Sequence, residues 1–202
     1  MHPQRSALAV VIVPLAVAAT AGASGASCVP AAGKTLRSSG AARIYSVGSG
    51  LYGCLGPRRT RLGPLRGTVP FPATRITLYT LSSGYAGTDR VQMGVDTLNS
   101  TVSLVNLHTG ATVGTAPGTT PERRAESFIT VTAMVVDAKG TLAWIGERSA
   151  IGVPAPTYEV HALNAARDRL LASSATIVAT SLRLHGETFS WRQGGHVRSA
   201  TL

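Results

Sequence analysis

The sequence of 202 residues predicts an all-β protein made of about four antiparallel sheets. Only 14% of the residues are charged, while 22 Gly and 11 Pro provide frequent turns. Short apolar or β-branched runs recur with a period of two residues, separated by tight turns. Helical periodicity with caps is absent, apart from one plausible helical turn within 164–171. A β-sandwich is the alternative arrangement of these strands.

Residues 1–27 have the pattern of an export signal. Arg5 provides a positive charge, the run from Ala7 to Ala19 is apolar, and Ala21-Gly22-Ala23 offers a cleavage site. The apolar run is shorter than the roughly twenty residues that a membrane-spanning helix needs. We therefore expect a secreted or envelope-associated protein without a membrane span in its mature chain. An uncleaved amino-terminal anchor is the alternative.

The two cysteines, Cys28 and Cys54, form an even pair in a chain that we expect to be exported. In an oxidising compartment such a pair predicts a disulfide, which here would tie the new amino terminus to the first β region. A lipid-modified Cys28 is the alternative, because small residues precede it as in a lipoprotein signal. Gly25 stands where such signals usually have an aliphatic residue.

After an irregular lead-in over 28–42, a β-repeat domain is expected over 43–202. Gly48-Ser49-Gly50 between two apolar runs predicts a hairpin. The stretch 56–73 is rich in Gly and Pro and predicts a long surface connection, with a brief strand at 61–65 as an option. The expected β runs are 43–47, 51–55, 75–81, 85–95, 101–107, 111–115, 128–136, 141–147, 158–163, 169–173, 180–184, 188–192 and 196–202.

An internal repeat relates the two tryptophans. Trp144 and Trp191 each follow an apolar strand, a tight turn and a small residue. Their separation matches the period of about 40 to 50 residues of propeller blades, and Thr74 to Gly118 reads as a third copy with Tyr85 near the Trp position. We expect both tryptophans to be packing residues between stacked sheets. The amino-terminal β segment would then supply the fourth strand of the last sheet.

With these features the chain resembles uncharacterised exported bacterial proteins with degenerate WD40-like or β-propeller repeats. The segments that carry the resemblance are Gly140 to Trp144, Thr101 to Gly110 and Gly186 to Trp191. The Gly-His and Trp-Asp signatures of true WD40 blades are missing. The resemblance implies a small or partial propeller-like array, and binding or scaffolding rather than one fixed chemistry.

The formal net charge is +10, with 19 Lys and Arg against 9 Asp and Glu. This excess would attract anionic partners, although a GC-rich genome also produces Arg-rich proteins. We predict an anion-binding cluster on the surface connection, since guanidinium groups suit phosphate or carboxylate. Nucleic acid is not the expected partner, because aromatic residues only flank the cluster. The cluster consists of Arg58, Arg59, Arg61 and Arg66.

Other motifs predict little chemistry. Residues 48–53 match G-x-G-x-x-G, but Cys54-Leu55-Gly56-Pro57 cannot start the helix that a nucleotide site needs. The mature chain has no G-x-S-x-G, and we expect solvated or hydrogen-bonded turn histidines rather than a metal site. Of the four histidines that follow the signal, His108 and His185 are expected in turns, and His161 and His196 on β runs.

No catalytic residue, metal or cofactor is therefore predicted. The expected function is a non-enzymatic exported protein that binds or scaffolds at the cell envelope, with an anionic envelope polymer or another protein as partner. The alternative is an extracellular hydrolase or lyase acting on polysaccharides or esters, whose acids meet at one mouth of the array. Its carboxylates would come from Asp89, Asp96, Asp137, Glu147, Glu159 and Glu187.

Overall fold

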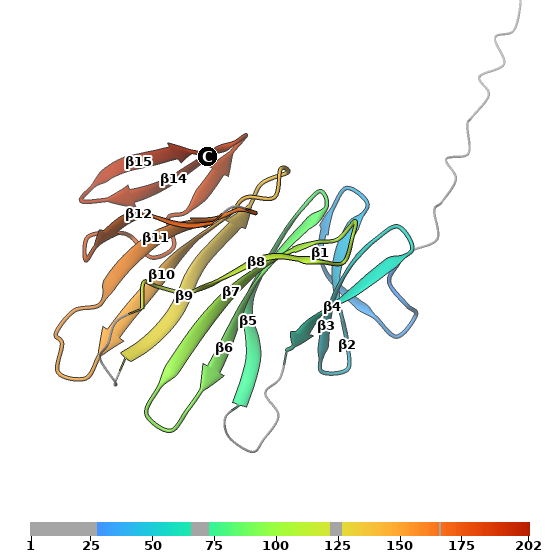
Figure 1. Ribbon diagram of the computed structural model, residues 1–202, viewed down its shortest axis with the longest axis horizontal. Coiled ribbons are helices and arrows are strands. Elements are labelled where there is room, and N and C mark those ends of the chain that lie inside the picture. Colours follow the sequence, from blue (N-terminus) through green and yellow to red (C-terminus); the bar gives the residue numbers. More distant parts are fainter. Residues whose placement is uncertain (1–27, 66–72, 122–126, 166) are drawn as a thin grey trace, which may run out of the picture.

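The computed structural model describes residues 28–65, 73–121, 127–165 and 167–202. These residues form strands β1 to β15 and contain no helix, so the predicted all-β class is confirmed (Figure 1). The strands form antiparallel sheets of four, eight and three members, none of which closes into a barrel. Within each run of sequential antiparallel strands the connections are short, as the frequent Gly and Pro residues predict.

The first sheet follows the chain order. It consists of β1 (Lys34–Ser39), β2 (Ala42–Val47), β3 (Gly50–Leu55) and β4 (Arg58–Pro64). The hairpin predicted at Gly48-Ser49-Gly50 is confirmed between β2 and β3. The expectation of an irregular lead-in over 28–42 is wrong for β1, which pairs with β2 across Gly40 at a φ of 56°. Its side chains are polar or half-exposed on both faces, so no alternation indicated a strand.

The eight-stranded sheet contains two successive meanders of four strands each. The first meander is β5 (Ala73–Ser82), β6 (Tyr85–Met93), β7 (Leu98–Asn106) and β8 (Thr112–Pro117). The second is β9 (Ser127–Val136), β10 (Leu142–Ala150), β11 (Thr157–Leu163) and β12 (Asp168–Ser174). A parallel contact between Leu98 of β7 and Phe128 of β9 joins the two. Two of the four expected sheets are therefore connected through backbone pairing.

The last sheet has the order β13 (Arg183–His185), β14 (Thr188–Gln193) and β15 (His196–Thr201). We had expected the amino-terminal β segment to supply a fourth strand here. That expectation is wrong: β1 is hydrogen-bonded to β2 in the first sheet. Figure 1 shows the first and last sheets at opposite ends of the molecule.

Three apolar cores lie between successive meanders, and they explain why the sheets stack. Ile44 and Leu51 of the first sheet pack with Leu107. Leu104 packs with Trp144 in the second core, and Ile145 packs with Phe189 in the third. A single antiparallel meander leaves its apolar faces in water, so each sheet is stabilised by the next. The opening strands of successive meanders, β1, β5, β9 and β13, contact one another in this order.

The outer face of the first sheet is covered by the segment that begins at Cys28. The predicted disulfide between Cys28 and Cys54 is present, with a Cα–Cα distance of 6.0 Å. Tyr45 packs beside it and stacks on Tyr52, with ring centroids 5.5 Å apart. Because the Cys28 sulfur is bonded to Cys54, it cannot also carry a lipid thioether. The structure thus favours the disulfide over the lipoprotein alternative.

The two tryptophans occupy related places, as the repeat predicts. Trp144 lies on β10 and Trp191 on β14, the second strand of each meander. Their relative exposures are 0% and 5%, so both are packing residues. The indole Nε1 of Trp144 also donates a hydrogen bond to the carbonyl of Gly118, at 2.8 Å.

Candidate functional site

The predicted arginine cluster lies on strand β4 rather than on a surface loop. Arg59 and Arg61 stand opposite Cys54 and Tyr52 of β3, and Arg58 stands opposite Leu55. The prediction of a loop was wrong because Arg side chains fit an exposed strand face as well as a turn. Arg66 lies outside the described residues.

The three described arginines of the cluster have different roles. Arg59 Nε donates to the carbonyl of Cys28 at 2.8 Å and so holds the segment beside the disulfide. Arg58 donates to the carbonyl of Thr109 at 3.0 Å, which links β4 to the turn after β7. Arg61 is exposed, and its guanidinium makes no hydrogen bond to the described residues. Arg58 and Arg61 are therefore the members that can contact a partner without releasing the Cys28 segment.

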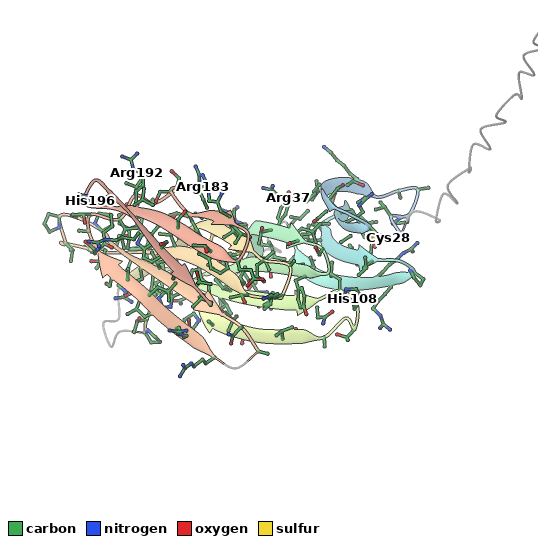
Figure 2. All side chains as sticks on the ribbon, turned by 90° about the horizontal axis from the view of Figure 1, so that it is seen from above. Cys28, Arg37, His108, Arg183, Arg192 and His196 are labelled. Atoms are coloured by element: carbon green, nitrogen blue, oxygen red, sulfur yellow. A yellow bond between two sulfur atoms is a disulfide. The ribbon has the colours of Figure 1, made fainter. Side chains whose placement is uncertain are left out.

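A cavity of about 480 Å³ opens beside this cluster. Leu55, Pro57, Arg58 and His108 line it. Both Arg58 and His108 are exposed, and the turn that carries His108 is fixed by a hydrogen bond from its backbone N–H to Asn106 Oδ1 at 2.8 Å. Figure 2 shows His108 and Cys28 at the same end of the molecule. A guanidinium and an imidazole beside an open cavity can bind an anion.

Carboxylates and guanidinium groups are distributed very differently. Asp89, Asp137 and Glu159 are buried, with relative exposures of 0%, 2% and 4%. Glu187 is exposed, and it pairs with Lys139 at 2.6 Å. The exposed arginines in the described part of the chain are Arg37, Arg58, Arg59, Arg61, Arg75, Arg90, Arg167, Arg169, Arg183, Arg192 and Arg198. The described surface is therefore positive because most of the compensating acids lie inside or are paired.

A buried polar network, which sequence reasoning missed, crosses β10, β11 and β12. His161 Nε2 lies 2.8 Å from Glu159 Oε2, and its Nδ1 lies 3.1 Å from Asp168 Oδ1. Arg148 lies 3.5 Å from the other Glu159 oxygen. Both ring nitrogens of His161 face carboxylate oxygens, and this arrangement favours the doubly protonated, positively charged ring.

Burial alone lowers the pKa of His161, but the hydrogen bonds and charges of Asp168 and Glu159 outweigh burial and raise it. For Glu159, burial raises the pKa, whereas the N–H of Thr120, His161 and Arg148 together hold it below its usual range. The Thr120 N–H donates to Glu159 Oε2 at 2.6 Å. The network thus anchors the linker between β8 and β9 to the second meander.

His161 of this network is closed to solvent. Its relative exposure is 2%, and it does not line the cavities that contain Arg183, Arg58 or Tyr85. His161 lies on β11, as the β run expected over 158–163 predicts, and it is stacked on Trp144. Glu159 and His161 are two residues apart on one strand, so their side chains share a face. This spacing was the sequence signal that could have indicated the buried pair.

The carboxylates proposed for a hydrolase do not line those cavities either. Asp89 lies on β6 inside the first meander, where Thr77 donates to its Oδ2 at 2.5 Å. Burial raises the pKa of Asp89, and the hydrogen bond from Thr77 opposes that rise only in part. Asp137 accepts hydrogen bonds from the backbone N–H groups of Lys139 and Thr141 and thereby shapes the turn between β9 and β10.

Comparison with models of protein families, with curated proteins and with solved structures gave no match. Within the described ranges, no helix is long and apolar enough to cross a membrane. The same ranges hold no group of three or more His, Cys, Asp or Glu side chains placed to hold a metal ion. The geometry of the molecule alone must therefore support a function.

Proposed function

We propose that this chain is an exported, non-enzymatic β-repeat protein of the propeller-like type, which binds an anionic polymer of the cell envelope. The observation that carries this proposal is the separation of charge, with exposed arginines outside and buried or paired carboxylates inside. Neutralising several anionic groups on one polymer gives affinity without a deep pocket. The disulfide agrees with an oxidising compartment outside the cytoplasm.

The contact surface that we propose is the edge strand β4 together with the turn that carries His108. Arg58 and His108 are exposed beside the same cavity, and Arg61 is exposed on the other face of this edge strand. Arg58 is held in place by Thr109, so less side-chain entropy is lost when it binds. The neighbouring turn residues, Gly56 and Pro57, are also exposed. The stacked sheets behave as a rigid support, because each apolar face is covered by its neighbour.

The test is chromatography of the folded protein on heparin and on immobilised anionic wall polymer at low salt. We expect retention, with elution at lower salt for the double variant Arg58→Ser, Arg61→Ser. Arg59 is left intact because it holds the carbonyl of Cys28. The double variant Arg167→Ser, Arg169→Ser loses the same charge from exposed residues next to β12 and at its start, and is the matched control.

Retention that falls equally in both double variants would indicate only non-specific charge. Absence of retention at low salt would exclude the proposed binding. An activity screen on polysaccharide and ester substrates accompanies the binding test, because turnover would favour the hydrolase alternative.

A further inference from the structure

We infer that the last sheet carries a second, separate site, which takes an anionic sugar unit. A cavity of about 340 Å³ lies on this sheet, and Arg183, Arg192, Ser181, Ser190, Trp191 and Val197 are among its lining residues. This volume is at the lower end of the range of small-molecule sites, and it suits one sugar ring. The inference does not depend on polymer binding at β4, since the two cavities share no lining residue.

Strand register brings the polar groups of this site together. Arg183 of β13 stands opposite Ser190 of β14, and Val197 of β15 stands opposite Arg192. Ser190 and Arg192 are two residues apart on one strand, so their side chains lie on the same face. Figure 2 shows Arg183 and Arg192 on the same side of the molecule, far from Cys28 and His108.

Two of these polar groups have no partner among the described residues. The guanidinium of Arg192 and the hydroxyl of Ser190 make no hydrogen bond there, whereas Arg183 is fixed by the carbonyls of Thr180 and Leu182 at 2.9 and 2.7 Å. A polar outer face is expected for the terminal sheet of a stacked array and does not by itself indicate a site. The cavity does indicate a binding site, because it lies between the fixed guanidinium of Arg183 and the unbonded guanidinium of Arg192.

The lining defines the chemistry of the ligand. Guanidinium groups recognise carboxylate or phosphate, and the Ser190 hydroxyl can exchange hydrogen bonds with sugar hydroxyls. The Ser181 hydroxyl is already bonded to Val178 and Arg192 and helps to shape the cavity. Val197 is 71% exposed and offers an apolar wall for the C–H groups of a ring. Trp191 is only 5% exposed, so it provides an edge and no stacking platform for a nucleobase.

The test measures the binding of glucuronate, glucose 6-phosphate, glucose and inorganic sulfate to the folded protein. Calorimetry gives the affinities, and the indole N–H signals in NMR spectra report which tryptophan is affected. We expect the two sugar acids to bind at least tenfold more tightly than glucose or sulfate. The comparison between them shows whether carboxylate or phosphate is preferred. The signal of Trp191 should shift, whereas that of Trp144, which is fully buried elsewhere, should stay unchanged.

Arg192→Gln should weaken binding of the sugar acids about tenfold, since one charge-assisted hydrogen-bond partner is lost. Arg169→Gln removes the same charge from exposed β12 outside the cavity and should leave the affinity unchanged. Equal affinity for sulfate, equal effects of the two substitutions, or an unmoved Trp191 signal would each overturn the inference. The double variant Arg58→Ser, Arg61→Ser should still bind sugar acids. Failure of the polymer proposal can therefore be told apart from failure of this inference.

Discussion

The imidazole of His161 stacks on the indole of Trp144, with ring centroids 5.0 Å apart and ring planes inclined by 10°. Trp144 belongs to the apolar core between the two central meanders, and its Nε1 reaches the linker at Gly118. Glu159 reaches the same linker at Thr120. The buried charges and the apolar core therefore stabilise one connection, that between β8 and β9.

His161 should make stability depend on pH near neutrality. Its raised pKa means that the folded state binds its proton more tightly than the unfolded state, where the pKa is about 6.5. The stabilisation is complete below about pH 6.5 and is lost as pH rises through the folded pKa. We expect urea unfolding, followed by circular dichroism, to show this loss.

His161→Gln should remove that pH dependence and cost about 3 kcal/mol at pH 6, because it breaks a buried charge pair. His185 is exposed at the end of β13, so His185→Gln is the control and should leave the profile unchanged. A His161→Gln profile parallel to that of the unsubstituted protein would contradict the assigned charge.

Asp89→Asn should stabilise the protein at neutral pH. Burial raises the pKa of Asp89, so the folded state loses stability as pH rises from about 3.9, the unfolded value, through the folded pKa. Asparagine has almost the same shape without the buried charge, and its carbonyl can still accept the hydrogen bond from Thr77. The gain, about 1 kcal/mol, should be largest near pH 7 and vanish near pH 3.

The relevant measurement is the free energy of unfolding of both proteins at several pH values. Asp96→Asn, at an exposed turn, provides the matched control and should have no effect. A constant difference between the Asp89 variant and the parent at all pH values would contradict the explanation.

Gly146→Ala should be strongly destabilising. A Cβ built at Gly146 of β10 would clash with the carbonyl oxygen of Gly118, which is backbone and cannot rotate away. The linker would have to leave the positions that Trp144 and Glu159 fix, at a cost of about 3 kcal/mol. Thermal unfolding measures this cost, and Ser149→Ala on the same strand is the control. An unchanged Tm for Gly146→Ala would show that the linker is not closely packed there.

Loss of the disulfide should lower stability by about 3 kcal/mol, because closing a loop between residues 26 positions apart restricts the unfolded chain. The double variant Cys28→Ser, Cys54→Ser should unfold at lower urea and be insensitive to dithiothreitol. The parent protein should shift to the same midpoint on reduction. A parent midpoint that reductant leaves unchanged would mean that the loop closure contributes nothing.

Local pattern was sufficient for several features of this protein. Period-two alternation predicted the β class, the glycines around Ser49 predicted a hairpin, and an even cysteine pair predicted the disulfide. The sequence also predicted that Trp144 and Trp191 are packing residues, and both are buried. These features depend on residues close together in the chain or on a simple count.

Tertiary structure alone decided which polar residues lie inside. The sequence placed His161 and Glu159 on a strand, but their burial depends on Asp168, Arg148 and the backbone of Thr120, which come together only when sheet and linker fold. Tertiary structure also decided that the polar segment Lys34–Ser39 forms β1. Pairing with β2 satisfies the backbone hydrogen-bonding groups of this segment, although its sequence does not alternate between apolar and polar residues. Spacing shows alternation within a strand; the partners that stabilise a buried charge come from distant segments, and only folding brings them together.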